Sequence, residues 1–375
     1  MSSGGDAVIP LHRPVVWGNE IKYVTEAIRS GAPASGPFVE RFEEALAARL
    51  GCPHVIAVSS CTAALHLALL GLGAKPGVWV MVPDLTFAAT ANAVMHCGAT
   101  PVFIDVEPDY WQMDPAKVWD ALEAGRKIGR IPEWSVLLPV DLLGHPCQRV
   151  ELTTLAGTFG AHYLEDRAES LGTEVDGDPG ISLACFSFNG NKVITAGGGG
   201  AVATRDPELA SMLRMLRDQG KEPHAPGGHR LVGYNYRMPN MMAALGLAQL
   251  ENLAQILKKK AHIAHYYGRG LEGLEAVELP KVAPGVRPNW WLFTVLVPEE
   301  SLGRLLKAFE EAKIEVRRMF RPLSGLKAFE NFPGNRLVNS WRIYRRAICL
   351  PSGPGLSMRD QDRVMDVLWR ELRGG

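Results

Sequence analysis

Short apolar segments alternate with amphipathic ones through the first two thirds of the chain. Runs of Val, Ile, Leu and other apolar residues predict buried strands over residues 77–83, 100–106, 134–142 and 161–166. Between these runs, apolar residues recur at helical spacing and stop at a glycine over residues 61–73, 87–98 and 150–160. This alternation, with few hairpin signals, predicts an α/β fold with a mainly parallel sheet covered by helices on both faces.

The pattern changes in the last third of the chain. Asp206 and Pro207 are typical of a helix start, and a long helical pattern runs over residues 239–267. The segments that follow predict one strand over 290–297 and helices near 301–312, 336–346 and 358–372, with Ser357 as the cap of the last helix. We therefore expect a flexible tail over residues 1–12, a large domain over 13–255 and a smaller α+β domain over 256–375.

The composition of the chain argues against several classes of protein. The chain has 375 residues, of which 47% are hydrophobic, and its 40 basic and 40 acidic side chains cancel. A neutral chain of this kind predicts no nucleic-acid or anionic-membrane partner. The six cysteines are scattered without a Cys-x-x-Cys pair, so no metal site or disulfide framework is expected, and reduced thiols favour a cytoplasmic location. No apolar stretch is long enough to span a bilayer, and no leader-like segment opens the chain.

The segment CFSFNGNKVITAGGGG, residues 185–200, carries the most specific chemistry. Lys192 lies between two predicted strands, at an edge of the kind where α/β sheets bind ligands. The glycines at 197–200 remove side chains that would keep a flat ligand away. A lysine in a partly dry pocket can act as a neutral amine and form a Schiff base with a carbonyl, although a solvated lysine is the simpler interpretation of one lysine alone. The spacing excludes a phosphate-binding loop of the Walker type, because Val193 follows the lysine.

An aldehyde cofactor such as pyridoxal phosphate would need three further groups near Lys192. A carboxylate must keep the pyridine nitrogen protonated, and Asp166 ends a predicted strand at the same edge, where it could also be a turn former. A flat side chain must face the ring, and Phe87 follows a predicted strand, where core packing is the alternative.

The third requirement is a phosphate site. Ser59, Ser60 and Thr62 precede an apolar helix, and helix-start amides with hydroxyls bind anions, although an ordinary helix cap explains the same residues. Ser187 could add a hydroxyl from the segment of the lysine.

Together these segments resemble the fold-type I pyridoxal-phosphate enzymes, and specifically the DegT/DnrJ/EryC1/StrS sugar aminotransferase family. The resemblance covers nearly the whole chain and includes the motifs TAALHLAL, PDLTFAATANAV, LEDRAESLGT, FSFNGNKVITAGGGG, GYNYRMPNMMAALGLAQLE and NWWLF. It implies a large pyridoxal-phosphate domain and a small C-terminal domain. It also implies that Lys192 is the Schiff-base lysine and proton shuttle, that Asp166 pairs with the pyridine nitrogen, and that Phe87 stacks on the ring.

The same resemblance assigns the remaining site residues. It implies that Thr62, the amide of Ala63 and Ser187 hold the phosphate, and that Glu169 lies near the cofactor and the sugar. Asn235 matches a residue that reaches the phosphate from a neighbouring subunit, which implies a homodimer with shared active sites.

The branch that the sequence resembles most is the legionaminic-acid and bacillosamine type. Those enzymes aminate C4 of a nucleotide-linked 4-keto-6-deoxy sugar, typically UDP-linked and N-acetylated. We expect L-glutamate as donor, 2-oxoglutarate as its product and pyridoxamine phosphate as the intermediate form of the cofactor. A GDP-perosamine synthase, an aminotransferase for a cyclitol or another ketone without a nucleotide, and a non-catalytic cofactor-binding regulator remain alternatives. A sugar dehydratase of the same fold is disfavoured, because those relatives carry His at the position of Lys192.

Several positions depart from the common family pattern. Gly198 replaces a frequent Glu, and Arg167 replaces a usual Ala beside Asp166, where it either lowers the pKa of that carboxyl or faces outward. Asp141 and Ser324 stand where His is common, which leaves the sugar open. For the diphosphate of the nucleotide, the candidates are His224, His229 and Arg230, in a Gly/Pro-rich segment that a solvated loop explains equally well.

Overall fold

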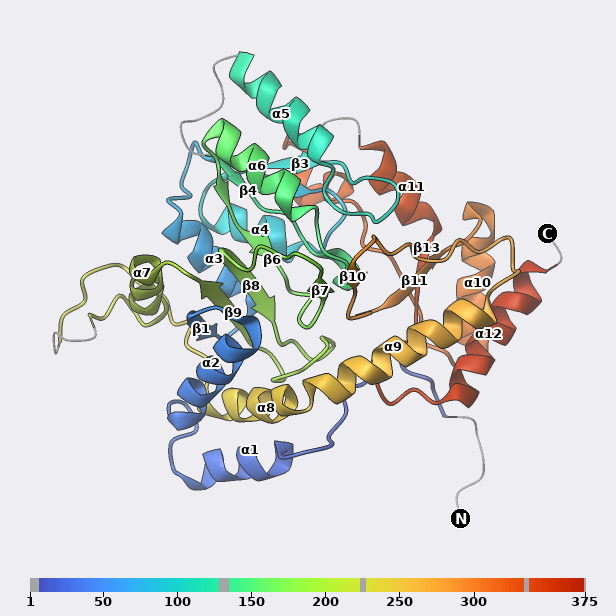
Figure 1. Cartoon of the computed structure of the whole chain (residues 1–375), viewed down its shortest axis with the longest axis horizontal. Coiled ribbons are helices and arrows are strands. Elements are labelled where there is room, and N and C mark those ends of the chain that lie inside the picture. Colours follow the sequence, from blue (N-terminus) through green and yellow to red (C-terminus); the bar gives the residue numbers. More distant parts are fainter. Residues whose placement is uncertain (1–6, 128–134, 223–226, 334–336, 374–375) are drawn as a thin grey trace.

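A mixed β-sheet forms the centre of the first two thirds of the chain. The computed structural model describes residues 7–127, 135–222, 227–333 and 337–373 (Figure 1). One half has the strand order β3 (Thr100–Ile104), β2 (Trp79–Pro83), β4 (Ser135–Leu137) and β5 (His162–Tyr163). The other half has the order β6 (Glu165–Asp166), β8 (Leu183–Ser187), β9 (Gly200–Thr204) and β1 (His54–Val58), and β6 follows β5 along the same stretch of chain. A parallel bridge between Val140 and Asp166 joins the two halves.

Most neighbouring strands are parallel, as the alternation of strands and helices predicts. β2 is parallel to β3 and β4, β4 to β5, and β6 to β8, whereas β9 is antiparallel to both β8 and β1. The direction reverses at β9 because the loop that carries Lys192 returns the chain directly beside β8. The single strand expected over residues 161–166 is divided at the buried Leu164, where pairing passes from β4 to β8.

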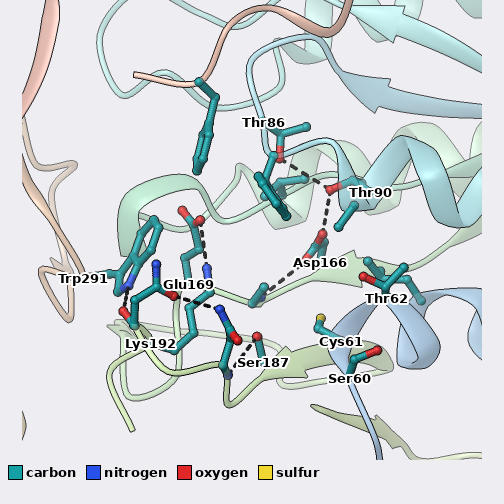
Figure 2. Close-up of a pocket in the computed structure, with 18 of the residues that line it drawn as sticks. Ser60, Cys61, Thr62, Thr86, Thr90, Asp166, Glu169, Ser187, Lys192 and Trp291 are labelled. Carbon is teal, nitrogen blue, oxygen red and sulfur yellow. Dashed lines mark hydrogen bonds and ion pairs between the residues drawn. The ribbon is translucent and has the colours of Figure 1, made fainter. Parts of the chain in front are cut away.

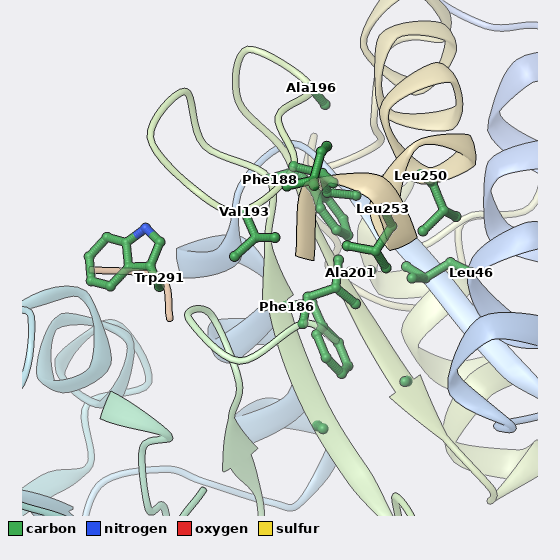
Figure 3. Packing of buried hydrophobic residues seen from close by; sticks show 14 of the residues in the cluster. Leu46, Phe186, Phe188, Val193, Ala196, Ala201, Leu250, Leu253 and Trp291 are labelled. Atoms are coloured by element: carbon green, nitrogen blue, oxygen red, sulfur yellow. The ribbon is translucent and has the colours of Figure 1, made fainter. Parts of the chain in front are cut away.

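Helices cover both faces of this sheet. Alternate residues of β1 point to opposite faces, so Ile56 packs in one apolar cluster while Val55 and Ala57 pack in another. The first cluster is closed by α3 (Cys61–Gly71), α4 (Ala89–His96) and α7 (Pro207–Arg217). The second is closed by α2 (Pro37–Leu50) and α8 (Asn240–Glu251), and its interior includes Phe186, Phe188 and Leu250 (Figure 3). Beside β2 and β3, a smaller cluster is closed by α5 (Pro115–Lys127) and α6 (Arg149–Phe159).

The long helical pattern over 239–267 is two helices rather than one. α8 ends at Glu251 and α9 spans Leu253–Gly270, with Asn252 between them. In Figure 1, α9 leads away from α8 toward the C-terminal part of the chain. Within the described residues, no helix combines the length and the hydropathy needed to cross a bilayer.

The C-terminal part is an α+β unit with a core of its own. Its sheet has the antiparallel order β11 (Phe293–Leu296), β13 (Ala347–Leu350) and β12 (Arg317–Arg318). Its helices are α10 (Glu299–Glu311), α11 (Val338–Arg346) and α12 (Met358–Leu372). The caps predicted for α7 and α12 are present, since Asp206 accepts hydrogen bonds from the amides of Glu208 and Leu209, and Ser357 accepts one from Asp360.

Short elements complete the chain. They are α1 (Glu20–Arg29), β7 (Glu174–Val175), β10 (Val286–Arg287), and the 3-10 turns η1 (Leu142–Gly144), η2 (Leu323–Gly325) and η3 (Lys327–Phe329).

The described part of the predicted flexible tail is packed. Ile9 is 3% exposed and lies in the core of the C-terminal unit. Its amide donates to the carbonyl of Lys313 at 2.9 Å, and its carbonyl accepts from the amide of Glu315 at 2.8 Å. The prediction of a free tail is therefore wrong for this segment, because an apolar residue near the start completes the small core. The boundary near residue 255 stays a prediction.

Candidate active site

A cavity of about 300 Å³ lies where β6 and β8 end, beside the N-terminus of α3. Strand ends and helix starts of this kind are where open α/β sheets place ligands. Of the residues expected to form a site, the structure brings together Thr62, Asp166, Glu169, Ser187 and Lys192 (Figure 2). Phe87 lines the same cavity.

The side chain of Lys192 reaches into this cavity and contacts two groups there. Its Nζ lies 3.1 Å from Oε1 of Glu169 and 3.8 Å from the centroid of the Trp291 ring (Figure 2). Glu169 is fixed in turn, because its Oε2 accepts a hydrogen bond from the amide of Leu143 at 2.8 Å. The ion pair and the aromatic face hold the lysine amine over the cavity.

The four glycines after Lys192 serve different purposes. Gly198 and Gly199 line the cavity, and Gly199 has a φ of +95°, which disfavours any side chain. Gly200 is needed for another reason, since a Cβ there would lie 2.6 Å from the amide nitrogen of Cys61. The glycine run therefore both opens the cavity and lets β9 approach the start of α3.

Asp166 presents a buried carboxylate to the same cavity. Thr90 donates its hydroxyl to Oδ2 at 2.8 Å, and the amide of Ala168 donates to Oδ1 at 3.1 Å. Burial raises the pKa of Asp166 from 3.8 to about 6, although these two hydrogen bonds oppose the shift. Among the residues that the structure describes, no Lys or Arg forms an ion pair with this carboxylate.

The start of α3 forms another part of the cavity wall. Ser60 caps the helix, since its Oγ accepts a hydrogen bond from the amide of Ala63 at 3.1 Å. Ser60, Thr62 and Ser187 line the cavity, whereas Ala63 is buried behind them and is not part of its wall. Hydroxyl groups beside a helix N-terminus suit an anion.

Two phenylalanines lie at the side of the cavity. Phe87 is 58% exposed and lies with its ring centroid 5.6 Å from that of Phe320. An exposed aromatic ring beside an open cavity is available to a planar ligand.

Some sequence-predicted residues lie elsewhere. Asn235 is exposed and pairs with Asp218 in an isolated bridge, away from the cavity of its own chain. His229 and Arg230 are not among the cavity residues either, and His224 lies outside the described residues.

Arg167 does not act on Asp166. Its guanidinium turns to the other side, where its Nε lies 3.4 Å from Oδ2 of Asp141 and 3.8 Å from Oε2 of Glu165. Asp141, Cys147 and Glu165 also hold potential metal-ligand atoms within 4.8 Å of one another, but the cations of Arg149 and Arg167 already balance both carboxylates. Asp141 is thus a member of this cluster, whereas Ser324 hydrogen-bonds Asp84.

Several cavity residues were not predicted from the sequence as site residues, among them Thr90, Trp291, Arg317 and Phe320. Trp291 is 1% exposed and is anchored on several sides, because its Nε1 donates to the carbonyl of Asn191 at 2.7 Å and its carbonyl accepts from Nζ of Lys260 at 3.1 Å. The motif NWWLF contains Trp291, but the sequence held no signal that its ring would reach Lys192.

The residues of the cavity fit pyridoxal phosphate. They offer an amine for its aldehyde, hydroxyl groups at a helix start for its phosphate, and a buried carboxylate for its ring nitrogen. The most specific feature is Asp166, because a buried carboxylate that has no cation in ion-pair contact among the described residues is stabilised by a ligand that brings a positive charge.

Comparisons with known proteins agree with this geometry. The family model described as "DegT/DnrJ/EryC1/StrS aminotransferase family" matches residues 16–369. The chain is 38% identical over 372 residues to EpsN of Bacillus subtilis, which is named provisionally as a pyridoxal phosphate-dependent aminotransferase; the match covers 96% of this chain and 95% of EpsN. It is 36% identical to the GDP-perosamine synthase of Caulobacter vibrioides, over 96% of this chain and 97% of that protein. The crystal structure of S. venezuelae DesV in complex with a ketimine intermediate is similar with a TM-score of 0.86 and 34% identity, over 94% of each chain.

Proposed function

Because the chain belongs to the DegT/DnrJ/EryC1/StrS aminotransferase family, we propose that it transfers an amino group to C4 of a nucleotide-linked 4-keto-6-deoxy sugar. The family makes the protein a pyridoxal phosphate-dependent aminotransferase of nucleotide sugars. Within that class, our proposal is that the sugar is UDP-linked and N-acetylated, that L-glutamate is the donor, and that 2-oxoglutarate is released.

The observation that carries the proposal is the placement of Lys192 and Asp166 in one cavity. When bound, pyridoxal phosphate supplies an aldehyde that reacts with amines and a protonated ring that accepts electrons. In our proposal, Asp166 holds the proton on the ring nitrogen through its charge, and Thr90 orients that carboxylate.

Lys192 is proposed as the acid–base group. Its Nζ takes a proton from the donor carbon that bears the amino group, and in the second half of the reaction it returns one to C4 of the sugar. Glu169 and Trp291 hold Nζ on one side of the cavity, so the amine stays within reach of either substrate carbon.

We further propose a homodimer in which each subunit completes the site of the other. Asn235 is exposed and lies away from the cavity of its own chain, and Val232, three residues earlier, is 91% exposed. A complementation experiment tests this arrangement: Lys192→Ala and Asn235→Ala chains are each purified and then mixed. Shared sites predict that mixed dimers regain one intact site and measurable turnover, whereas no recovery in confirmed mixed dimers contradicts sharing.

The substrate is tested in two half-reactions followed by absorbance. L-Glutamate should bleach the band of the bound cofactor, and among UDP-, GDP- and TDP-linked 4-keto-6-deoxy sugars only the UDP-linked N-acetylated one should restore it efficiently. Selective restoration by the GDP-linked sugar would support the alternative, a GDP-perosamine synthase activity, which the 36% identity to such an enzyme favours. Restoration only by a ketone without a nucleotide would overturn both.

A further inference from the structure

Asn289 is a buried asparagine that joins the two groups around the amine of Lys192. It is 2% exposed and precedes β11. Its Nδ2 donates to the carbonyls of Glu169 at 2.7 Å and Leu171 at 3.0 Å, and its Oδ1 accepts from the amide of Trp291 at 2.9 Å. Glu169 and Trp291 are the two residues that contact Nζ of Lys192. One side chain therefore ties together the backbones of both contacts.

The bond from the amide of Trp291 to the side chain of Asn289 closes an Asx turn. Between them, Trp290 has a φ of +53°, in the left-handed region that a bulky residue adopts only where its surroundings hold it there. The turn sets the direction in which the chain enters residue 291, and Lys260 holds the carbonyl that follows. The ring of Trp291 is thus aimed at Lys192 by its own backbone.

The same asparagine is linked to the turn that fixes the carboxylate of Glu169. Thr173 accepts a hydrogen bond from the backbone amide of Asn289 at 3.1 Å and donates its hydroxyl to the carbonyl of Gly144 at 2.7 Å. Gly144 has a φ of +85°, and a Cβ there would overlap Oδ1 of Asn289. Leu143, one residue earlier, donates its amide to Oε2 of Glu169. The backbone and the carboxylate of Glu169 therefore belong to one hydrogen-bonded web.

We propose that Asn289 is a positioning residue that acts through Glu169 and Trp291. By keeping these two at one spacing, it fixes where Nζ of Lys192 lies when it moves a proton, and a misplacement of about 1 Å costs about 100-fold in rate. Asn289 is not among the residues that line the cavity, so it should affect the rate and not the binding of either substrate. The inference rests on the proposed function for the proton-transfer role of Lys192.

The test compares Asn289→Ser with the matched control Asn240→Ser, both as cofactor-loaded enzymes. Serine at 289 still offers an acceptor to the amide of Trp291 but is too short to reach the two carbonyls. Asn240 is equally buried, and its side chain also joins two distant backbones, those of Ala32 and Phe38. Asn289→Ser should lower the maximum rate of both half-reactions by about 10- to 100-fold and change KM by less than about 3-fold. Asn240→Ser should stay within about 3-fold of the wild type in both.

Two further measurements separate positioning from packing. Without substrates, the absorption band of the bound cofactor changes with pH, and its midpoint depends on the charges around the nitrogen that joins it to Lys192. A carboxylate and an aromatic face both stabilise positive charge, so displacing them should lower this midpoint by about 0.5–1 pH unit in Asn289→Ser and leave Asn240→Ser unchanged. In a double-mutant cycle with Glu169→Gln, the rate losses should be far from multiplicative, because Asn289 acts through Glu169.

A higher KM with an unchanged maximum rate would make Asn289 a substrate-binding residue and overturn the proposal. Rate losses that the control shares, or that multiply with those of Glu169→Gln, would make it a packing residue and overturn it as well. If Asn289→Ser does not fold, Thr173→Val keeps the asparagine but removes the acceptor of its backbone amide. That variant should show the same pattern at a smaller size, and an unchanged rate and midpoint would contradict the proposal. If no ketosugar reacts, the proposed function fails, yet the L-glutamate half-reaction and the pH midpoint still report on Asn289.

Discussion

Three consecutive charged residues, 165–167, are buried, but on opposite faces of one segment. The side chains on one face pair with opposite charges, and, within the described residues, the side chain on the other face does not. Glu165 and Arg167 point into a cluster with Asp141 and Arg149, whereas Asp166 points into the cavity. The alternation follows from strand geometry, in which successive side chains point to opposite faces. All of these side chains are nearly inaccessible to solvent.

The cluster balances its own charges. Nε of Arg149 lies 2.8 Å from Oε2 of Glu165, and its Nη2 contacts Asp141, which also accepts the hydroxyl of Ser170 at 2.6 Å. Burial works to raise the pKa of both carboxyls. For Asp141 the guanidinium groups of Arg149 and Arg167 outweigh burial and hold the pKa below its usual value, whereas for Glu165 burial outweighs them and the pKa is raised.

The cavity side leaves its charge unbalanced. Asp166 has a hydroxyl and an amide as donors but no cation in ion-pair contact among the described residues, and its pKa is raised to about 6. The paired charges of the cluster therefore stabilise the folded chain, whereas the unpaired carboxylate of Asp166 is available to a positively charged ligand. An unbalanced buried carboxylate is a signature of a binding site.

The largest effect is expected from Asp166→Asn on activity. The amide keeps the shape but cannot stabilise a protonated ring nitrogen, so the half-reaction with L-glutamate should slow by about 10³-fold. Stopped-flow absorbance of the cofactor-loaded variant measures the rate. A loss below about 10-fold would show that this carboxylate does not act on the ring.

Removing a cation from the cluster of Asp141, Arg149, Glu165 and Arg167 should lower the free energy of unfolding. Arg149→Met leaves Asp141 and Glu165 with one cation fewer and should cost about 3–5 kcal/mol of unfolding free energy. Urea unfolding measures it, with exposed Arg318→Met as control. A cost equal to that of the control would mean that the cluster is not a structural ion network.

The pH dependence of stability should differ between Asp166 and Asp141. The folded-state pKa of Asp166, about 6, lies above its unfolded value of 3.8, so folding becomes less favourable as pH rises from 3.8 to 6. Above pH 6 the cofactor-free chain carries the full penalty, about 3 kcal/mol. Asp141 has the opposite sign: its lowered pKa stabilises the fold above 3.8, and this stability is lost as pH falls.

The same substitution that slows the half-reaction should therefore stabilise the cofactor-free protein. Asp166→Asn should raise the unfolding free energy relative to wild type at pH 8, and the gain should shrink by about half at pH 5. Urea titrations of both proteins at the two pH values check this. A gain that is constant or grows toward low pH contradicts an unbalanced Asp166.

The smallest effect is expected from Thr90→Val. This variant removes one neutral hydroxyl donor to Asp166 and keeps the volume, so the pKa of Asp166 should rise further and the half-reaction should slow by about 10-fold. The pH profile of the half-reaction should shift upward with it. An unshifted profile would mean that Thr90 only fills space.

The sequence predicted those features that depend on residues close together along the chain. Apolar periodicity and helix caps placed most elements of the sheet and its helices, and the strand-end rule brought Lys192 and Asp166 to one edge. Strand alternation alone could also have turned Arg167 away from Asp166, which the sequence interpretation left open.

The missed residues depend on packing between distant segments. Trp291 contacts Lys192 and Arg317 contacts Trp291, both from more than 90 positions further along the chain, and no local pattern encodes that approach. Ile9 likewise joins the small core through contacts with residues some 300 positions away. Because nothing near Ile9 in the sequence signals those contacts, the segment was predicted to be a flexible tail.

The claim on which the account depends is that the amine of Lys192 holds the cofactor. Borohydride reduction of the loaded enzyme, followed by digestion and peptide mass mapping, tests it directly. We predict a phosphopyridoxyl mass on the peptide that contains Lys192 and on no other lysine. Label on a different residue, or none in a sample shown to be fully loaded, would contradict the account.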